Sequence, residues 1–203
     1  SSDVCSSDLV QVDDQVWECL PDASGPEFFM YDLSWRSFSS GMVDVEAIYQ
    51  QVGVEVSNIA SLREAMATIF ERWGACAIAV KSQHAYDRTL FCNEPSDSDA
   101  ERVLMRLLAG EQLTPGDRIC LGDWCLARGV EFAIQANLPF KIHTGYYCRI
   151  NRLRTERIRP GHLCSLLIRY PEARFVLMHA GYPYTAEMVA IARSWACASS
   201  TTS

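Results

Sequence analysis

The 203-residue sequence contains no apolar run that approaches the ~20 residues needed to cross a membrane. Its first residues lack the basic and apolar regions of a signal peptide. The net charge of −7 leaves little positive charge to hold nucleic acid or an anionic membrane surface. We therefore expect a cytoplasmic protein that binds neither nucleic acid nor membrane.

Paired cysteine ligands are also missing. The nine cysteines include no C-x-x-C pair, so a zinc site built from cysteines is not expected. Cys76, Cys120, Cys125 and Cys164 lie within apolar segments instead. They are interpreted as buried free thiols of a protein in a reducing compartment.

Four apolar runs are typical of buried strands. They contain few polar positions, and strands covered on both faces of a parallel sheet have this pattern. The predicted strands are residues 28–33, 75–81, 139–143 and 174–179. With 49% hydrophobic residues in 203, one domain with one core is the default.

Helical patterns lie between these strands. Two of them begin with a capping-box signature, Ser61 with Glu64 and Ser98 with Glu101. Thr114 is the expected N-cap of a third and longer helix, whose first position is Pro115. The predicted helices cover residues 61–73, 98–108, 114–137, 159–171 and 185–195.

The alternation of strands and helices predicts an α/β fold with a parallel sheet. Two architectures fit this order, a (β/α)8 barrel and a doubly wound open sheet. A complete barrel needs roughly 250 residues, so four strands would form about half of one.

Two stretches end an apolar strand in the same way: "PFKIHTGYY" at 139–147 and "RFVLMHAGYPY" at 174–184. His143 and His179 thus follow consecutive predicted strands, each two residues before a glycine. Lys81 ends the preceding strand, and Asp32 lies near the end of the first. Because chemistry in parallel α/β folds collects at the C-terminal ends of strands, we expect the two histidines to share one site. Two interpretations of Lys81 remain open: it is a functional or modified amine, or it is a structural lysine paired with a carboxylate.

Other polar residues have weaker functional interpretations. His84 follows the Lys81 strand and could line the mouth of the site, whereas His162 is expected to face solvent. Asp87 and Arg88 are expected to pair with each other or with neighbours. The basic segment 145–160 either holds an anionic substrate or is a solvated loop; its arginines are Arg149, Arg152, Arg154, Arg157 and Arg159.

The segments "VKSQHAYDRTL", "LPFKIHTGYY" and "RPGHLCSLLIRYPEARFVLMHAGYPYTAEMVAIAR" resemble the amidohydrolase-related metal-dependent hydrolases over about residues 60–195. The resemblance implies a TIM barrel and a divalent metal, expected to be zinc. It implies that His143 is a metal ligand and that His179 binds metal or polarises the attacking water or the substrate. Lys81 matches a region where some relatives carry a carboxylated lysine that bridges two metals.

The sequence also departs from the pattern of that family. It contains no His-x-His and no strand-eight aspartate, so we interpret it as a central fragment, about strands three to six. Residues 2–9 resemble a translated sequencing adapter, with a disordered native terminus as the alternative. We therefore expect a non-native leader at 1–9, a barrel domain at 10–195 and a truncated or frameshifted tail at 196–203. Open sheet edges predict a homo-oligomer.

The resemblance implies hydrolysis of an amide, a lactone or a carboxylated small molecule by metal-activated water, although this chain alone is expected to be inactive. Decarboxylases, hydratases and sugar-acid isomerases on the same barrel are the first alternative. A non-catalytic α/β ligand-binding domain, with structural histidines, is the second.

Overall fold

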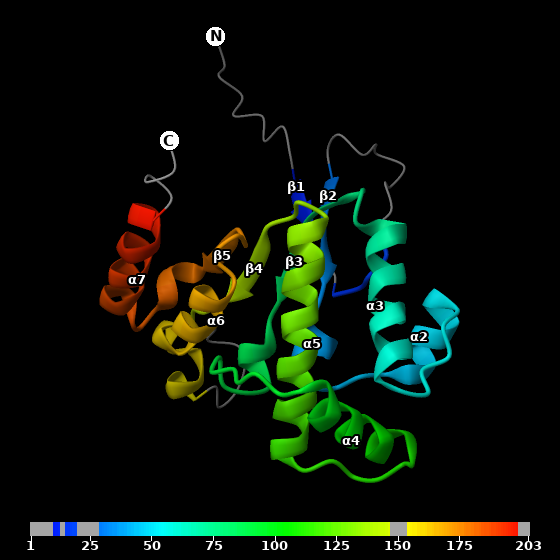
Figure 1. The fold of residues 1–203 in the computed structure, drawn as a ribbon. Coiled ribbons are helices and arrows are strands. Elements are labelled where there is room, and N and C mark those ends of the chain that lie inside the picture. The colour runs from blue at the N-terminus through cyan, green and yellow to red at the C-terminus, as the bar shows by residue number, and fades with distance from the viewer. Residues whose placement is uncertain (1–9, 13–14, 20–28, 147–153, 199–203) are drawn as a thin grey trace.

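The computed structural model describes residues 10–12, 15–19, 29–146 and 154–198. These residues form a parallel sheet whose five strands are neighbours in chain order (Figure 1). The strands are β1 (Val10–Val12), β2 (Phe29–Ser34), β3 (Ala77–Ser82), β4 (Phe140–His143) and β5 (Phe175–Met178). None of the helices in the described ranges has the length and apolar character of a membrane span.

The strand order decides between the two expected architectures. A doubly wound sheet reverses its strand order at a switch point, whereas the order β1-β2-β3-β4-β5 proceeds in one direction, like the wall of a barrel. The fold is therefore a partial (β/α)8 barrel, as predicted. The four predicted strands are confirmed within one or two residues at each end, and the three-residue β1 is a fifth that was not predicted.

Helices connect the strands and pack against the sheet, with α3 and α5 in front of it in Figure 1. The helices are α1 (Arg36–Ser39), α2 (Val45–Val52), α3 (Ile59–Trp73), α4 (Asp97–Leu108), α5 (Pro115–Gln135), α6 (Cys164–Arg169) and α7 (Thr185–Ala198). Short 3₁₀ turns cover His84–Tyr86, Thr155–Ile158, Pro160–Leu163 and His179–Gly181. Helices α1 and α2 were not predicted, and α7 continues three residues into the expected tail at 196–203.

The start of α5 is confirmed. The Thr114 side chain accepts the backbone N–H of Asp117, and Pro115 occupies the first turn. The cap predicted for α3 was wrong, because Asn58 has the extended backbone of an N-cap and Ser61 is its capping-box partner.

The cap predicted for α4 was wrong for the same reason. Ser96 caps this helix together with Asp99, in place of Ser98 and Glu101. Where several serines and acidic residues follow one another, the sequence offers more than one cap, and the backbone conformation selects among them.

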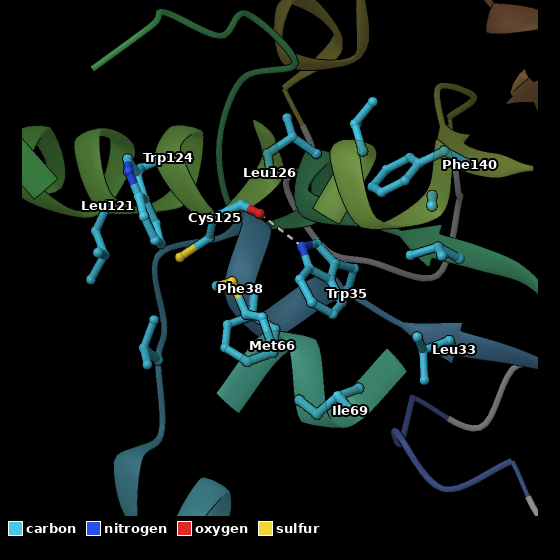
Figure 2. Packing of buried hydrophobic residues seen from close by; sticks show 14 of the residues in the cluster. Leu33, Trp35, Phe38, Met66, Ile69, Leu121, Trp124, Cys125, Leu126 and Phe140 are labelled. Carbon is cyan, nitrogen blue, oxygen red and sulfur yellow. Dashed lines mark hydrogen bonds between the residues drawn. The ribbon is translucent and has the colours of Figure 1, made fainter. Parts of the chain in front are cut away.

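The hydrophobic core lies between the sheet and helices α1, α3 and α5 (Figure 2). Trp35 is fully buried there, and its indole N–H donates to the Cys125 carbonyl at 2.9 Å. Gly129 allows this contact, since an added Cβ would lie 2.2 Å from the Trp35 ring nitrogen. Figure 2 labels Leu33, Trp35, Phe38, Met66, Ile69, Leu121, Trp124, Cys125, Leu126 and Phe140.

The expectation of buried thiols holds for Cys125, and burial raises the pKa of its thiol. It is wrong for Cys76, which is exposed because it lies in the turn before β3 and not in the strand. Cys120 and Cys164 are half-buried. Cys19 and Cys92 are buried free thiols as well.

Side chains alternate along each strand and thereby separate the core from a polar face. In β4, Phe140 and Ile142 belong to the hydrophobic core, so Lys141 and His143 point to the opposite face of the sheet. By the same alternation Lys81, next to the core residue Val80, lies on the face opposite the core. Asp32, Lys81, Lys141 and His143 are buried polar residues that therefore gather on the face of the sheet opposite the hydrophobic core.

Candidate active site

The two predicted histidines lie side by side. His143 ends β4 and pairs in register with Met178, the last residue of β5, so His179 follows directly beside it. Their ring centroids are 4.6 Å apart, with 57° between the ring planes. The parallel register therefore brings His143 and His179 to one point at the C-terminal edge of the sheet.

His143 is held by partners on both ring nitrogens. Its Nε2 is 2.6 Å from the Gly145 carbonyl, and its Nδ1 is 3.1 Å from the Tyr86 hydroxyl. In the neutral ring Nε2–H must donate, because a carbonyl only accepts, and Nδ1 then accepts from Tyr86. The side chain is buried, and the Tyr86 ring packs against it with centroids 4.5 Å apart. His143 is thus fixed in orientation and in tautomer.

The backbone around His179 is strained. His179, Ala180 and Gly181 have φ of 65°, 52° and 63°, a left-handed stretch that only glycine adopts without cost. Strain of this kind persists where the surrounding structure enforces it, and it clusters at functional sites. Gly145 contributes to that enforcement, because an added Cβ would lie 2.3 Å from the His179 Cβ. The two glycines that follow the histidines in the sequence thus have different roles. Gly145 lets His179 approach the backbone after β4, and Gly181 allows the left-handed turn after His179.

His179 differs electrostatically from a histidine in water. Burial lowers its pKa below the ordinary value of 6.5, and the positive charge of Lys81 lowers it further. The imidazole is therefore neutral at pH 7, and its side chain is exposed at the edge of the sheet. A neutral and accessible imidazole can accept a proton from water or from a substrate.

A layer of buried charge lies beside the histidines on the same face of the sheet. Lys81 of β3 and Lys141 of β4 are register partners, and they are the only lysines in the sequence. Lys141 Nζ is 2.9 Å from Asp32 Oδ1, and the Gln11 amide donates to the same carboxylate at 2.8 Å. Asp32 was a candidate site residue in the sequence, but Lys141 was not. Lys141 lies two residues before His143 in the strand "FKIH", and this spacing could have placed it on the same face of the sheet.

A series of buried hydrogen bonds fixes the segment that follows β3. The hydroxyls of Ser39 and Ser82 are 2.7 Å apart, and Ser82 Oγ is 2.7 Å from His84 Nδ1. His84 is fully buried, so it does not take the weaker of its interpretations, a place at the mouth of the site. Burial lowers its pKa well below 6.5, with further lowering from Arg88 and His143, and the ring is neutral. It supports the turn that carries Tyr86.

The remaining candidates have structural contacts. Asp87 pairs with Arg36 at 3.1 Å and Arg88 with Asp123 at 2.9 Å, so each pairs with a neighbour and not with the other. His162 is half-buried and not turned to solvent, because its Nδ1 lies 3.2 Å from the Thr89 hydroxyl.

The basic segment 145–160 is only partly described. Residues 147–153, with Arg149 and Arg152, lie outside the described ranges. Within the described part, Arg154 is exposed and Arg159 pairs with Glu187 at 3.0 Å.

Replacing Lys81 by methionine should raise the pKa of His179. Lys81→Met removes a positive charge that disfavours the imidazolium while keeping most of the side-chain volume, so protonation becomes easier. NMR titration of the ring protons can follow this change, because the sequence has only four histidines. Arg63→Met, on α3 at the helix-covered side of the sheet, is the matched control. An unchanged His179 titration in Lys81→Met would show that Lys81 does not act on this ring.

The described residues do not by themselves form a metal site. No group of three or more His, Cys, Asp or Glu side chains converges within the described ranges. Both nitrogens of the His143 ring have hydrogen-bond partners, Tyr86 at Nδ1 and the Gly145 carbonyl at Nε2, so neither presents a lone pair to a metal. The assignment of His143 and His179 as metal ligands stays a prediction.

Three solved structures resemble this fold. Uronate isomerase from Thermotoga maritima is 12% identical with a TM-score of 0.62, and glucuronate isomerase from Caulobacter crescentus is 16% identical with a TM-score of 0.63. A protein described as a metal-dependent hydrolase, from Lactobacillus casei, is 13% identical with a TM-score of 0.60. The matches cover 84%, 84% and 87% of this chain but only 43%, 40% and 46% of those chains. At these identities the likeness is one of fold.

Two sequence comparisons also gave matches. Protein fluG of Emericella nidulans is 38% identical over 120 residues, which are 54% of this chain and 14% of that protein. The chain therefore spans a small part of this relative and less than half of each solved structure. A family model described as amidohydrolase matches residues 85–200, a segment that contains both His143 and His179. Because that match covers more than half of the sequence, this chain belongs to the amidohydrolase family.

Proposed function

We propose that the protein hydrolyses a carbonyl-type bond of a small molecule, such as an amide, a lactone or a carboxylated compound. The observation that carries this proposal is the pair His143 and His179, with ring centroids 4.6 Å apart at the ends of two neighbouring parallel strands. In barrel enzymes the catalytic groups come from this edge of the sheet.

His179 is the proposed general base. Its lowered pKa keeps the ring neutral near pH 7, so it can take a proton from the water that attacks the carbonyl carbon. Lys81 acts on His179 by holding that pKa down, and its positive charge also favours negative charge that develops on the substrate oxygen. His143, oriented by Tyr86, packs against the His179 ring and holds the proposed base in position.

The amidohydrolase family implies a divalent metal, and we propose zinc. Among the described residues His143 and His179 are the proposed ligands, with no third, and His143 would present a lone pair only if its Nδ1 gave up the contact with Tyr86. Tight binding would need ligands beyond them, since zinc sites use three or four protein ligands. We assign no step of the reaction to the metal.

A test of the reaction uses ¹⁸O-labelled water and a panel of amides, lactones and hexuronates with the full-length protein encoded by the gene. We expect a product that has gained the elements of water and carries the label from solvent. Turnover that releases carbon dioxide would indicate decarboxylation. Absence of turnover on the whole panel, with and without added zinc, would favour the non-catalytic ligand-binding domain.

Isomerisation of a sugar acid is the second candidate. It is favoured by the similarity in fold to the uronate isomerase and the glucuronate isomerase. A neutral His179 could equally remove a proton from a carbon next to a carbonyl. The same experiment separates the two reactions, because an isomer has the mass of its substrate and hydrolysis products do not.

We also propose a cytoplasmic location and association of copies of the chain. The six cysteines whose side chains the structure describes are all free, which is compatible with a reducing compartment. The outermost strands of the described sheet, β1 and β5, each have one edge without a paired strand among the described residues. Such edges favour pairing with another chain.

A further inference from the structure

A pocket lies outside the candidate active site, and we name it the outer pocket. It has a volume of about 580 Å³ and is formed by the end of α1, the segment after the turn His84–Tyr86, the start of α5 and the turn Thr155–Ile158. Neither the two histidines of the site nor Lys81 lines it. The volume is in the range of pockets that take small molecules, roughly 300–1,000 Å³.

Two arginines give the outer pocket its charge. Arg118 comes from the first turn of α5 and Arg157 from the turn Thr155–Ile158. Among the residues that the structure describes, neither guanidinium has a carboxylate within ion-pair distance, and Arg157 donates only to the Asp87 carbonyl at 3.4 Å. Guanidinium groups present several N–H donors in a fork that fits carboxylate and phosphate oxygens.

The other charges that line the pocket are already compensated. The Asp87 carboxylate receives Arg36 at 3.1 Å and the Ser40 hydroxyl at 2.8 Å. Arg88 is paired with Asp123 at 2.9 Å inside the protein. The uncompensated charge of the outer pocket is therefore positive, in a chain whose net charge is −7.

The rest of the wall is largely apolar and includes Met42, Leu113 and Ile119. We propose that the outer pocket binds a small molecule through an anionic oxygen group, a carboxylate or a phosphate, held by Arg118 and Arg157. The apolar wall accommodates the remainder of that molecule. This site is additional to the hydrolytic one, and its occupancy is independent of the chemistry proposed at His179.

One residue that lines the outer pocket is adjacent in sequence to a residue that contacts the candidate active site. Asp87 directly follows Tyr86, whose hydroxyl contacts His143 at 3.1 Å. Binding and catalysis are nevertheless separable, because His143 lies on the sheet and does not line the pocket. The test can therefore include a variant that damages one site and spares the other.

The test is calorimetric titration of the chain with inorganic phosphate and, in a parallel arm, with succinate. We expect saturable binding of one anion per chain in at least one arm, and the arm that binds identifies the phosphate or the carboxylate as the ligand group. Arg118→Gln and Arg157→Gln should each weaken binding about tenfold or more, since each removes charge-assisted hydrogen bonds. Arg193→Gln, on the exposed side of α7, is the matched control and should bind like the wild type.

His143→Ala should keep the wild-type affinity, which separates this site from the proposed active site. Circular dichroism establishes that every variant is folded before it is titrated. Binding in neither arm, or equal affinity in both arginine variants and the wild type, would overturn the proposal. Loss of binding in His143→Ala would also overturn it, because the anion would then occupy the active site.

Discussion

Replacing His179 by alanine is expected to lower turnover by about 10²–10⁴-fold, the usual contribution of a general base. The ring is exposed at the strand edge, neutral at pH 7, and held beside His143 by a strained backbone. Alanine removes the proton acceptor and leaves the sheet and core intact. The measurement is kcat for the substrate that the full-length protein accepts, as a function of pH.

His162→Ala is the matched control, because His162 is a partly buried histidine on another part of the chain. It should keep turnover within a few-fold of the wild type. The pH dependence adds a second check: the acid limb of the wild-type profile should lie below pH 6.5 and move to higher pH in Lys81→Met. Wild-type turnover in His179→Ala would remove this residue from the mechanism.

Replacing Asp123 by alanine is expected to lower the free energy of unfolding by about 3–5 kcal/mol, the usual cost of leaving one member of a buried ion pair unpaired. Asp123 and Arg88 are only 0% and 6% exposed, and their charged groups are 2.9 Å apart. The carboxylate also accepts the Asn93 backbone N–H at 2.7 Å. Since domains are stable by about 5–15 kcal/mol, the loss is large.

Urea denaturation followed by circular dichroism measures this loss. The control is Arg154→Ala, whose partner Glu156 is 4.0 Å away and whose side chain is mostly exposed, so stability should hardly change. The double variant Asp123→Ala/Arg88→Met should be more stable than Asp123→Ala, because no unpaired buried charge remains. A double variant that is less stable by the sum of both single losses would show that the two charges are not coupled.

Much of the fold could be predicted from local sequence patterns. Apolar runs identified β2 to β5, and the Thr114–Pro115 pair located the start of α5, because hydrophobic periodicity and capping chemistry act over a few residues. The short β1 was missed since three residues give no periodic signal. The caps of α3 and α4 were misplaced because neighbouring polar residues compete for the same role.

The candidate site was predictable in part. The repeated His-x-Gly after two apolar strands predicted that His143 and His179 would meet, because parallel strands align their C-terminal ends. The partners of these residues depend on tertiary structure: Tyr86 reaches His143 from the segment after β3, and Lys141 reaches Asp32 across an intervening strand. No local pattern encodes such distances, and the complete burial of His84 could not be predicted for the same reason.

The central claim is that His143 and His179 act together in one catalytic site, and a double-mutant cycle on turnover tests it most directly. Turnover is compared among the wild type, His143→Ala, His179→Ala and the double variant in the full-length protein. Residues that act as a unit give non-additive losses, so we expect the double variant to be little slower than the slower single variant. Single losses that multiply in the double variant, or a single variant with wild-type turnover, would contradict the claim.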